Sequence, residues 1–200
     1  MEKGLLIVVS GPSGCGKGTV LGGITKELGL CYSVSATTRG MREGEADGVN
    51  YHYLTKEQFE ALIAEDKVLE YTTYCGNYYG TLRDEVESRR NQGQDVLLEI
   101  EVVGAANVKR LCPDAVLIFI APPSVAELDR RLRKRGTETE EVISARVAEA
   151  EREIRCASQY DYIVVNGALE KAVDDVASII KAERISAVNK ENLISEVLNS

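Results

Sequence analysis

The chain has 200 residues and carries 24 lysines and arginines against 32 aspartates and glutamates, a formal net charge of −8. This length is typical of one domain, and an apolar content of 44% is enough for a full core. The acidic balance argues against broad nucleic-acid binding, which uses a basic face. No apolar run approaches the roughly 20 residues that span a bilayer, and the first residues lack a signal-peptide pattern. We therefore expect a cytoplasmic protein without membrane or nucleic-acid partners.

Cysteine and histidine usage limits the metal and redox chemistry open to this chain. Five cysteines are an odd number, widely scattered and without a C-x-x-C pair; they are Cys15, Cys31, Cys75, Cys112 and Cys156. This pattern argues against a disulfide framework or a zinc site and favours reduced thiols. His52 is the single histidine, and we expect it to be a packing or surface residue.

Short apolar runs alternate with helical patterns along the chain. The runs are continuous, which is typical of strands buried on both faces of a parallel sheet; they span residues 5–10, 96–100, 116–121 and 162–165. Helical spacing and capping signals predict helices at residues 19–28, 124–135, 137–157 and 168–185, and a short amphipathic helix from about residue 189. Strands that alternate with helices predict an α/β fold with a parallel sheet flanked by helices.

Two segments interrupt this pattern. Residues 35–85 are polar and turn-rich and hold six of the nine tyrosines, which favours an inserted lobe of mixed sheet with one helix at 56–66. Residues 125–155 are rich in charge and predict a helical lid. We therefore divide the chain into a core (1–34, 86–124 and 156–200), an inserted lobe (35–85) and a lid (125–155).

A glycine-rich loop follows the first predicted strand and precedes the first predicted helix. Its pattern G-x-x-x-x-G-K is typical of P-loop nucleotide-binding proteins, in which backbone N–H groups and a lysine bind phosphates. We expect it to bind ATP through Gly11, Pro12, Ser13, Gly14, Cys15, Gly16, Lys17, Gly18 and Thr19. Gly18 stands where Ser or Thr commonly contacts Mg²⁺. Thr19 follows it, and we expect Thr19 to contact the Mg²⁺ that accompanies ATP, directly or through water.

Further motifs follow in order: SATTRGMREGE from Ser35, GVNYHY from Gly48, GNYYGT from Gly76, IAPPS from Ile120 and RGTETE from Arg135. With these motifs the chain resembles the guanylate kinases of the P-loop nucleoside monophosphate kinase family, from Gly11 to Asn166. The resemblance implies a P-loop sheet, a GMP-binding lobe at 35–85 and a lid at 125–155. It also implies transfer of the γ-phosphoryl group of ATP to GMP or dGMP, giving ADP and GDP or dGDP.

The resemblance implies a role for each matching residue. Residues expected to hold the acceptor phosphate are Arg39, Arg42, Tyr51 and Tyr79, and those expected to contact guanine are Ser35, Glu70 and Thr81. Glu70 suits guanine because one carboxylate accepts from both N1–H and the N2 amino group. Lid and catalytic residues are Lys17, Arg131, Arg135 and Arg146, and Asn166 lies near adenine.

The segment around Glu101 departs from the family pattern. Glu101 stands where the family commonly has Asp, and Val103 stands where it has Gln. We expect Glu101 to bind GMP, with its contact open between the guanine amino group and the metal shell. Glu99 ends the same predicted strand and is a second acid that faces the nucleotides in this prediction.

Two other functions remain as alternatives. One is a guanylate-kinase-like scaffold that binds proteins and does not catalyse, and the other is a P-loop kinase for another small phosphate acceptor. The complete phosphate loop argues against the scaffold. Glu70, together with Ser35 and Thr81, favours guanine over another acceptor. The sequence does not indicate an oligomeric state.

Overall fold

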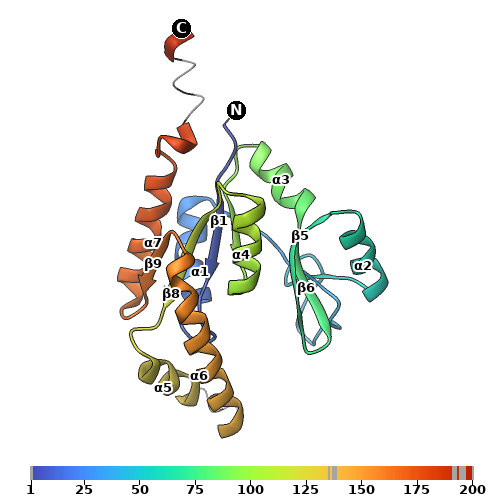
Figure 1. Ribbon diagram of the computed structural model, residues 1–200, viewed down its shortest axis with the longest axis vertical. Coiled ribbons are helices and arrows are strands. Elements are labelled where there is room, and N and C mark those ends of the chain that lie inside the picture. Colours follow the sequence, from blue (N-terminus) through green and yellow to red (C-terminus); the bar gives the residue numbers. More distant parts are fainter. Residues whose placement is uncertain (1, 135, 137–138, 191–192, 194–196, 200) are drawn as a thin grey trace.

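A computed structural model describes residues 2–134, 136, 139–190, 193 and 197–199. Its centre is a five-stranded sheet in the order β2-β7-β1-β8-β9, with every neighbouring pair parallel. The strands are β1 (Leu6–Ser10), β2 (Cys31–Tyr32), β7 (Val96–Glu99), β8 (Val116–Ala121) and β9 (Tyr162–Val165). The predicted α/β fold with a parallel sheet is confirmed (Figure 1).

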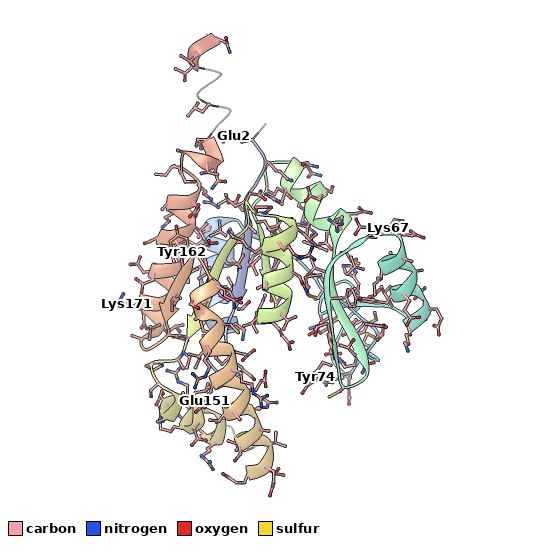
Figure 2. All side chains as sticks on the ribbon, viewed as in Figure 1. Glu2, Lys67, Tyr74, Glu151, Tyr162 and Lys171 are labelled. Atoms are coloured by element: carbon pink, nitrogen blue, oxygen red, sulfur yellow. The ribbon has the colours of Figure 1, made fainter. Side chains whose placement is uncertain are left out.

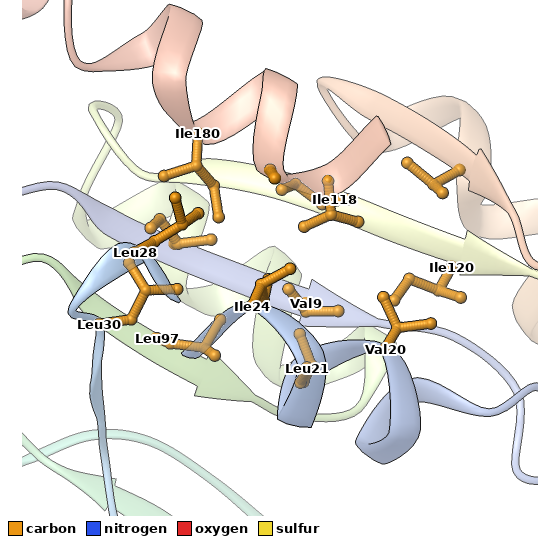
Figure 3. Close-up of a cluster of buried hydrophobic side chains, with 14 of the residues drawn as sticks. Val9, Val20, Leu21, Ile24, Leu28, Leu30, Leu97, Ile118, Ile120 and Ile180 are labelled. Carbon is orange, nitrogen blue, oxygen red and sulfur yellow. The ribbon is translucent and has the colours of Figure 1, made fainter. Parts of the chain in front are cut away.

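Helices cover both faces of this sheet. Helices α1 (Lys17–Leu28) and α7 (Leu169–Glu183) pack on one face, and α3 (Arg83–Asn91) and α4 (Val102–Leu111) pack on the other. Successive residues of a strand point to opposite faces, so Ile7 and Val9 join the first cluster while Leu6 and Val8 join the second. Figure 3 shows Ile24 of α1 and Ile180 of α7 gathered with Ile118 of β8.

The inserted lobe is a separate four-stranded sheet in the order β4-β3-β6-β5. Its strands are β3 (Ala36–Thr37), β4 (His52–Tyr53), β5 (Val68–Tyr74) and β6 (Asn77–Leu82), and its helix is α2 (Lys56–Ala64). One pair is parallel and two are antiparallel, as the prediction of a mixed sheet requires. Buried Phe59 of α2 stacks on Tyr78 with ring centroids 5.1 Å apart.

Helices α5 (Val125–Lys134) and α6 (Glu140–Arg155) form the predicted helical pair, followed by a 3-10 turn, η1 (Cys156–Gln159). Leu128 and Leu132 of α5 pack against Ile143 and Ala150 of α6 in a cluster of their own. Figure 1 shows this pair on one flank of the molecule and the small sheet with α2 on another. Figure 2 labels Glu151 on the first part and Tyr74 on the second.

Several elements differ from the prediction. Helix α1 begins at Lys17, two residues earlier than predicted, and α6 ends at Arg155, where the 3-10 turn takes over. Strand β2 and helices α3 and α4 were not predicted. Strand β2 has two residues, α3 buries one apolar residue, Val86, and α4 contains Gly104 in its first turn, so none has the periodicity that marks an element.

The end of the chain is described only in part. A 3-10 turn, η2, spans Val188–Lys190. The amphipathic helix predicted from about residue 189 includes 191–192 and 194–196, which lie outside the described residues. Within the part of the chain that the structure describes, no helix is long and apolar enough to cross a membrane.

The packing between α1, α7 and the sheet yields a stability prediction. Ile24 is fully buried, and Ile24→Ala leaves a cavity that the surrounding strands cannot fill, so we expect the free energy of unfolding to fall by about 2–5 kcal/mol. Urea denaturation followed by circular dichroism measures this change. Ile185 is 77% exposed, and Ile185→Ala is the matched control, expected within about 0.5 kcal/mol of the parent. Equal losses in both variants would contradict this account of the core.

Candidate active site

The loop between β1 and α1 approaches the segment after β9 closely at Gly16. Gly16 has φ 91°, and an added Cβ would lie 2.5 Å from Nδ2 of Asn166. Glycine is therefore required here by both conformation and space. No side chain caps α1, so the first N–H groups of the helix face the loop with the partial positive charge of the helix terminus. This geometry is that of an anion site.

Asn166 holds the loop in this shape. It is buried, and its Nδ2 donates to the carbonyl oxygen of Cys15 at 2.7 Å. The backbone oxygen of Asn166 accepts from Nη2 of Arg131 at 3.1 Å. One N–H of the Asn166 amide thus ties the segment after β9 to the loop.

Lys17 lies across the loop. Its Nζ donates to the carbonyl oxygens of Gly11 at 2.5 Å and Pro12 at 3.3 Å. Lys17 also lines a pocket of about 380 Å³ together with Ser13, Glu101 and Glu153. The loop thus places one ammonium group at the edge of a pocket whose other charged lining residues are the acids Glu99, Glu101 and Glu153.

Arginines from the helical pair reach the loop. Arg131 of α5 donates to Oε1 of Glu127 at 2.9 Å and to the Asn166 backbone, and Arg146 of α6 donates to Oγ of Ser13 at 3.1 Å. Both guanidinium groups therefore lie beside the phosphate loop. Arg135 lies outside the described residues. Arg130 and Arg133 form ion pairs with Glu127, Asp129 and Glu140 on the surface of the pair.

A second pocket, of about 310 Å³, adjoins the first and brings together most of the predicted acceptor residues. It is lined by Ser35, Tyr51, Glu70, Tyr79 and Glu101, with Gly104 and others. The two pockets share Ser35, Tyr51, Glu99, Ile100 and Glu101. A ligand in the second pocket would therefore extend toward Lys17 of the first.

Glu70 is the buried acid of this second pocket. It lies opposite Thr81 in the β5–β6 pair, and the Thr81 hydroxyl donates to its Oε1 at 2.8 Å. Thr81 is itself 1% exposed and does not line the pocket, and its contact with the pocket is the hydrogen bond to Glu70. A Cβ on Gly104 would lie 2.5 Å from Oε2 of Glu70, so the absence of a side chain there makes room for the carboxylate. Burial, with Glu101 nearby, raises the pKa of Glu70.

The two predicted phosphate arginines differ in their surroundings. Arg39 lies over the rings of Tyr51 and Tyr53, 5.5 and 5.8 Å from their centroids. Tyr51 in turn packs edge-on against Tyr79, with centroids 5.8 Å apart. The side chain of Arg42 is exposed, and neither Arg39 nor Arg42 lines either pocket. The structure thus joins Arg39 to the tyrosines and leaves Arg42 outside this cluster.

Two features of the site were not predicted. Tyr32 of β2 donates to Oε2 of Glu99 at 2.9 Å, which fixes an acid that lines both pockets. Glu153 of α6 lines the pocket of Lys17, and its burial raises its pKa to about 7; Lys17 opposes this rise, while Glu101 and Glu149 add to it. Glu153 stands in a run of charged residues, so no sequence pattern distinguishes it from its exposed neighbours.

This architecture defines a class of protein: a P-loop kinase of small phosphorylated molecules, with one pocket at the phosphate loop and a second pocket beside it. The model of the family described as guanylate kinase matches residues 3–183. The chain belongs to the guanylate kinase family.

Individual relatives agree with this assignment. Guanylate kinases of Halalkalibacterium halodurans and Oceanobacillus iheyensis are 50% and 52% identical to this chain, covering 98% and 92% of it and 95% and 90% of their own lengths. The crystal structure of guanylate kinase from Anaplasma phagocytophilum is similar at 32% identity with a TM-score of 0.73. That similarity covers 92% of this chain and 88% of the other.

The environment of Glu153 predicts a pH-dependent stability. Its folded-state pKa of about 7 exceeds the ordinary value of 4.5, so between these values the folded protein keeps a proton that the unfolded chain releases. The contribution of Glu153 to the free energy of unfolding therefore falls as the pH rises from 4.5 to about 7. Glu153→Gln removes this titration. We therefore expect the free energy of unfolding of the variant, relative to that of the parent, to increase by about 1–2 kcal/mol from pH 4.5 to pH 8.

Urea denaturation of both proteins at the two pH values measures this difference. Glu151→Gln, at an exposed position of the same helix, is the control and should track the parent at both pH values. A Glu153→Gln effect that is the same at pH 4.5 and pH 8 would contradict the prediction.

Proposed function

We propose that the protein is a guanylate kinase that transfers the γ-phosphoryl group of ATP to GMP or dGMP, giving ADP and GDP or dGDP in purine nucleotide metabolism and GMP recycling. The observation that carries the proposal is the buried carboxylate of Glu70 in a pocket that adjoins the phosphate-loop pocket of Lys17. Relatives of about the same length that are named guanylate kinase support it.

Glu70 would select the base. Guanine presents N1–H and an N2 amino group side by side, and one carboxylate accepts hydrogen bonds from both. Adenine presents an unprotonated N1 there, which leaves the buried carboxylate without a donor. Sites built on such buried polar pairs reject the wrong partner by roughly 10⁴–10⁵. Ser35 and Glu101, which line the same pocket, would add further contacts to the purine.

Cations near the junction of the two pockets would bind the phosphates. Arg39, with the hydroxyls of Tyr51 and Tyr79, would hold the phosphate of GMP, and Arg42 would approach it from its exposed position. At the loop, Lys17 would leave the carbonyl oxygens of Gly11 and Pro12 for the phosphates of ATP. Arginines of the predicted lid (125–155) would then stabilise the charge that develops during transfer; they are Arg131, Arg135 and Arg146.

The acceptor needs no general base. The second pKa of a phosphate monoester is near 6, so the attacking oxygen of GMP is already mostly deprotonated at neutral pH. The single histidine, His52, contacts Glu85 at 3.3 Å and lines neither pocket. Catalysis would therefore depend on positioning and on neutralising the charge of two polyanions.

Mg²⁺ would enter with ATP. Among the described residues no group of three acidic, histidine or cysteine side chains converges on one point, so the donors do not form a closed metal cage. Thr19 is exposed in the first turn of α1 beside the loop, where its hydroxyl suits a magnesium ion that keeps most of its waters. In that position the ion would neutralise phosphate charge.

We propose that the lobe (35–85) and the lid (125–155) close over a fixed core (1–34, 86–124 and 156–200). Closure would exclude water, which could otherwise accept the phosphoryl group. The lobe and the lid each have a small hydrophobic cluster of their own, which supports movement as bodies. We further propose a cytoplasmic protein whose partners are its nucleotides, without nucleic acid or membrane. Its oligomeric state stays open.

A substrate panel tests the function. We expect ADP formation in a coupled assay with GMP and dGMP, and background rates with AMP, CMP and UMP, because only guanine offers two adjacent donors to Glu70. Lys17→Ala is the matched inactive control, expected to lower turnover by about 10²-fold or more. Turnover with none of the nucleotides would favour the protein-binding scaffold, and turnover with a different phosphate acceptor would favour another P-loop kinase.

A substitution at Glu70 tests base selection. Glu70→Gln keeps the size of the side chain but removes the charge that accepts from guanine, and one hydrogen bond to a charged group contributes about 1.5–3 kcal/mol. We expect GMP binding, measured by calorimetry, to weaken by roughly 10- to 150-fold while ATP binding stays within about twofold. Equal losses for GMP and ATP would exclude this role.

A further inference from the structure

Glu45, in the exposed loop between β3 and β4, carries an unusual number of hydrogen bonds. Its carboxylate accepts from Nη1 and Nη2 of Arg39 at 3.0 and 2.8 Å, from the backbone N–H of Arg42 at 2.8 Å and from the hydroxyl of Tyr53 at 2.7 Å. The side chains of Arg39 and Glu45 are only 14% and 19% exposed. These donors, Arg39 first, lower the pKa of Glu45 to about 2, so it stays ionised.

The direction of these bonds matters for Arg39. A guanidinium has five N–H groups on two forked edges. Glu45 occupies the end edge, formed by Nη1 and Nη2, and the carbonyl oxygen of Gly40 accepts from Nη1 at 2.8 Å. The bonds to Glu45 and Gly40 use Nη1 and Nη2 and do not use Nε, which forms the side edge with the remaining Nη2 hydrogen. The rings of Tyr51 and Tyr53 fix the plane of the group.

We propose that Glu45 is a positioning residue for GMP. It binds the end edge of the Arg39 guanidinium and so orients the side edge of that group toward the phosphate of the acceptor. A phosphate accepts such a fork from arginine through two oxygens. Holding the long arginine side chain before the ligand arrives removes the entropy loss of ordering it on binding. The inference rests on the role of Arg39 proposed above, and Glu45 does not itself touch the ligand.

A purely structural role for Glu45 makes a different prediction. Its hydrogen bonds to Arg42 and Tyr53 also stabilise the loop between β3 and β4. Loss of that loop conformation would disturb the whole pocket. Guanosine, which has the base but no phosphate, separates the two. If Glu45 acts through the phosphate fork, its loss affects GMP and leaves guanosine unaffected.

The experiment compares GMP and guanosine binding to the parent protein and to Glu45→Gln by calorimetry, with guanosine measured by competition where its binding is weak. We expect GMP to bind roughly two- to twelvefold more weakly, the effect of releasing one long side chain, with guanosine unchanged. Glu43→Gln, at an exposed neighbouring position, is the control and should change neither ligand. Equal weakening of GMP and guanosine would overturn the proposal.

Variants of Arg39 separate this proposal from the function on which it rests. Arg39→Lys keeps the charge but cannot form the fork, so it should weaken GMP binding, and Glu45→Gln should then add little in the Arg39→Lys background. Unchanged GMP binding in Arg39→Lys would refute the assignment of Arg39 to the phosphate. Weakened binding in Arg39→Lys with a full, additive effect of Glu45→Gln would refute the positioning role alone. Tyr53→Phe, which removes one bond to Glu45 and keeps the ring, should move GMP affinity in the same direction by less.

Discussion

Hydrogen bonds between arginine and carboxylate set the direction of two cations, Arg39 and Arg131, in this acidic protein. Arg39 is held at one edge by Glu45, and Arg131 is held through Nε by Glu127 while its remaining nitrogens reach the backbone of the loop and of Asn166. A carboxylate at one edge of a guanidinium reduces the field of the cation but fixes where its other donors point. In a chain with net charge −8, Arg39 and Arg131 therefore each have a carboxylate partner, which in the proposed function would lie on the side away from the ligand.

The central sheet supplies the fixed reference for these groups. The loop after β1, the acids after β7 and Asn166 after β9 all stand at the carboxyl ends of parallel strands, where α/β proteins commonly bind ligands. The lobe and the helical pair are built differently, since each is held by its own small apolar cluster. The lobe is also joined to the core, because Leu69 of β5 belongs to the large cluster under α3 and α4, whereas no residue of the helical pair belongs to either large cluster among the described residues. This arrangement suits the closure proposed above, in which two nucleotides would enter separately and then be enclosed.

Much of this architecture could be predicted from the sequence, because strong local patterns carry it. Continuous apolar runs predicted four strands of the central sheet, and the glycine-rich pattern predicted the loop between β1 and α1. Helix α3 was not predicted because it buries mainly Val86 on an otherwise polar surface. Strand β2 was not predicted because its two residues are too few to show a period. In the site, Glu70 was found through the resemblance, whereas Glu45 and Glu153 depend on contacts across space that a charged sequence run does not reveal.

In the role proposed for Glu70, burial would make it a sharper selector of bases than an exposed acid. Desolvation raises its pKa, so the carboxylate is costly to keep ionised unless donors surround it. Thr81 supplies one donor to Oε1, and Oε2 lies beside Gly104, where any side chain would collide with it. The other hydrogen bonds that the Glu70 carboxylate needs would come from the base that enters the pocket. A purine that donates two N–H groups to the carboxylate would remove the desolvation penalty. A purine that faces the carboxylate with a lone pair would add electrostatic repulsion to that penalty. Discrimination then arises from the cost of the wrong complex as much as from the strength of the right one.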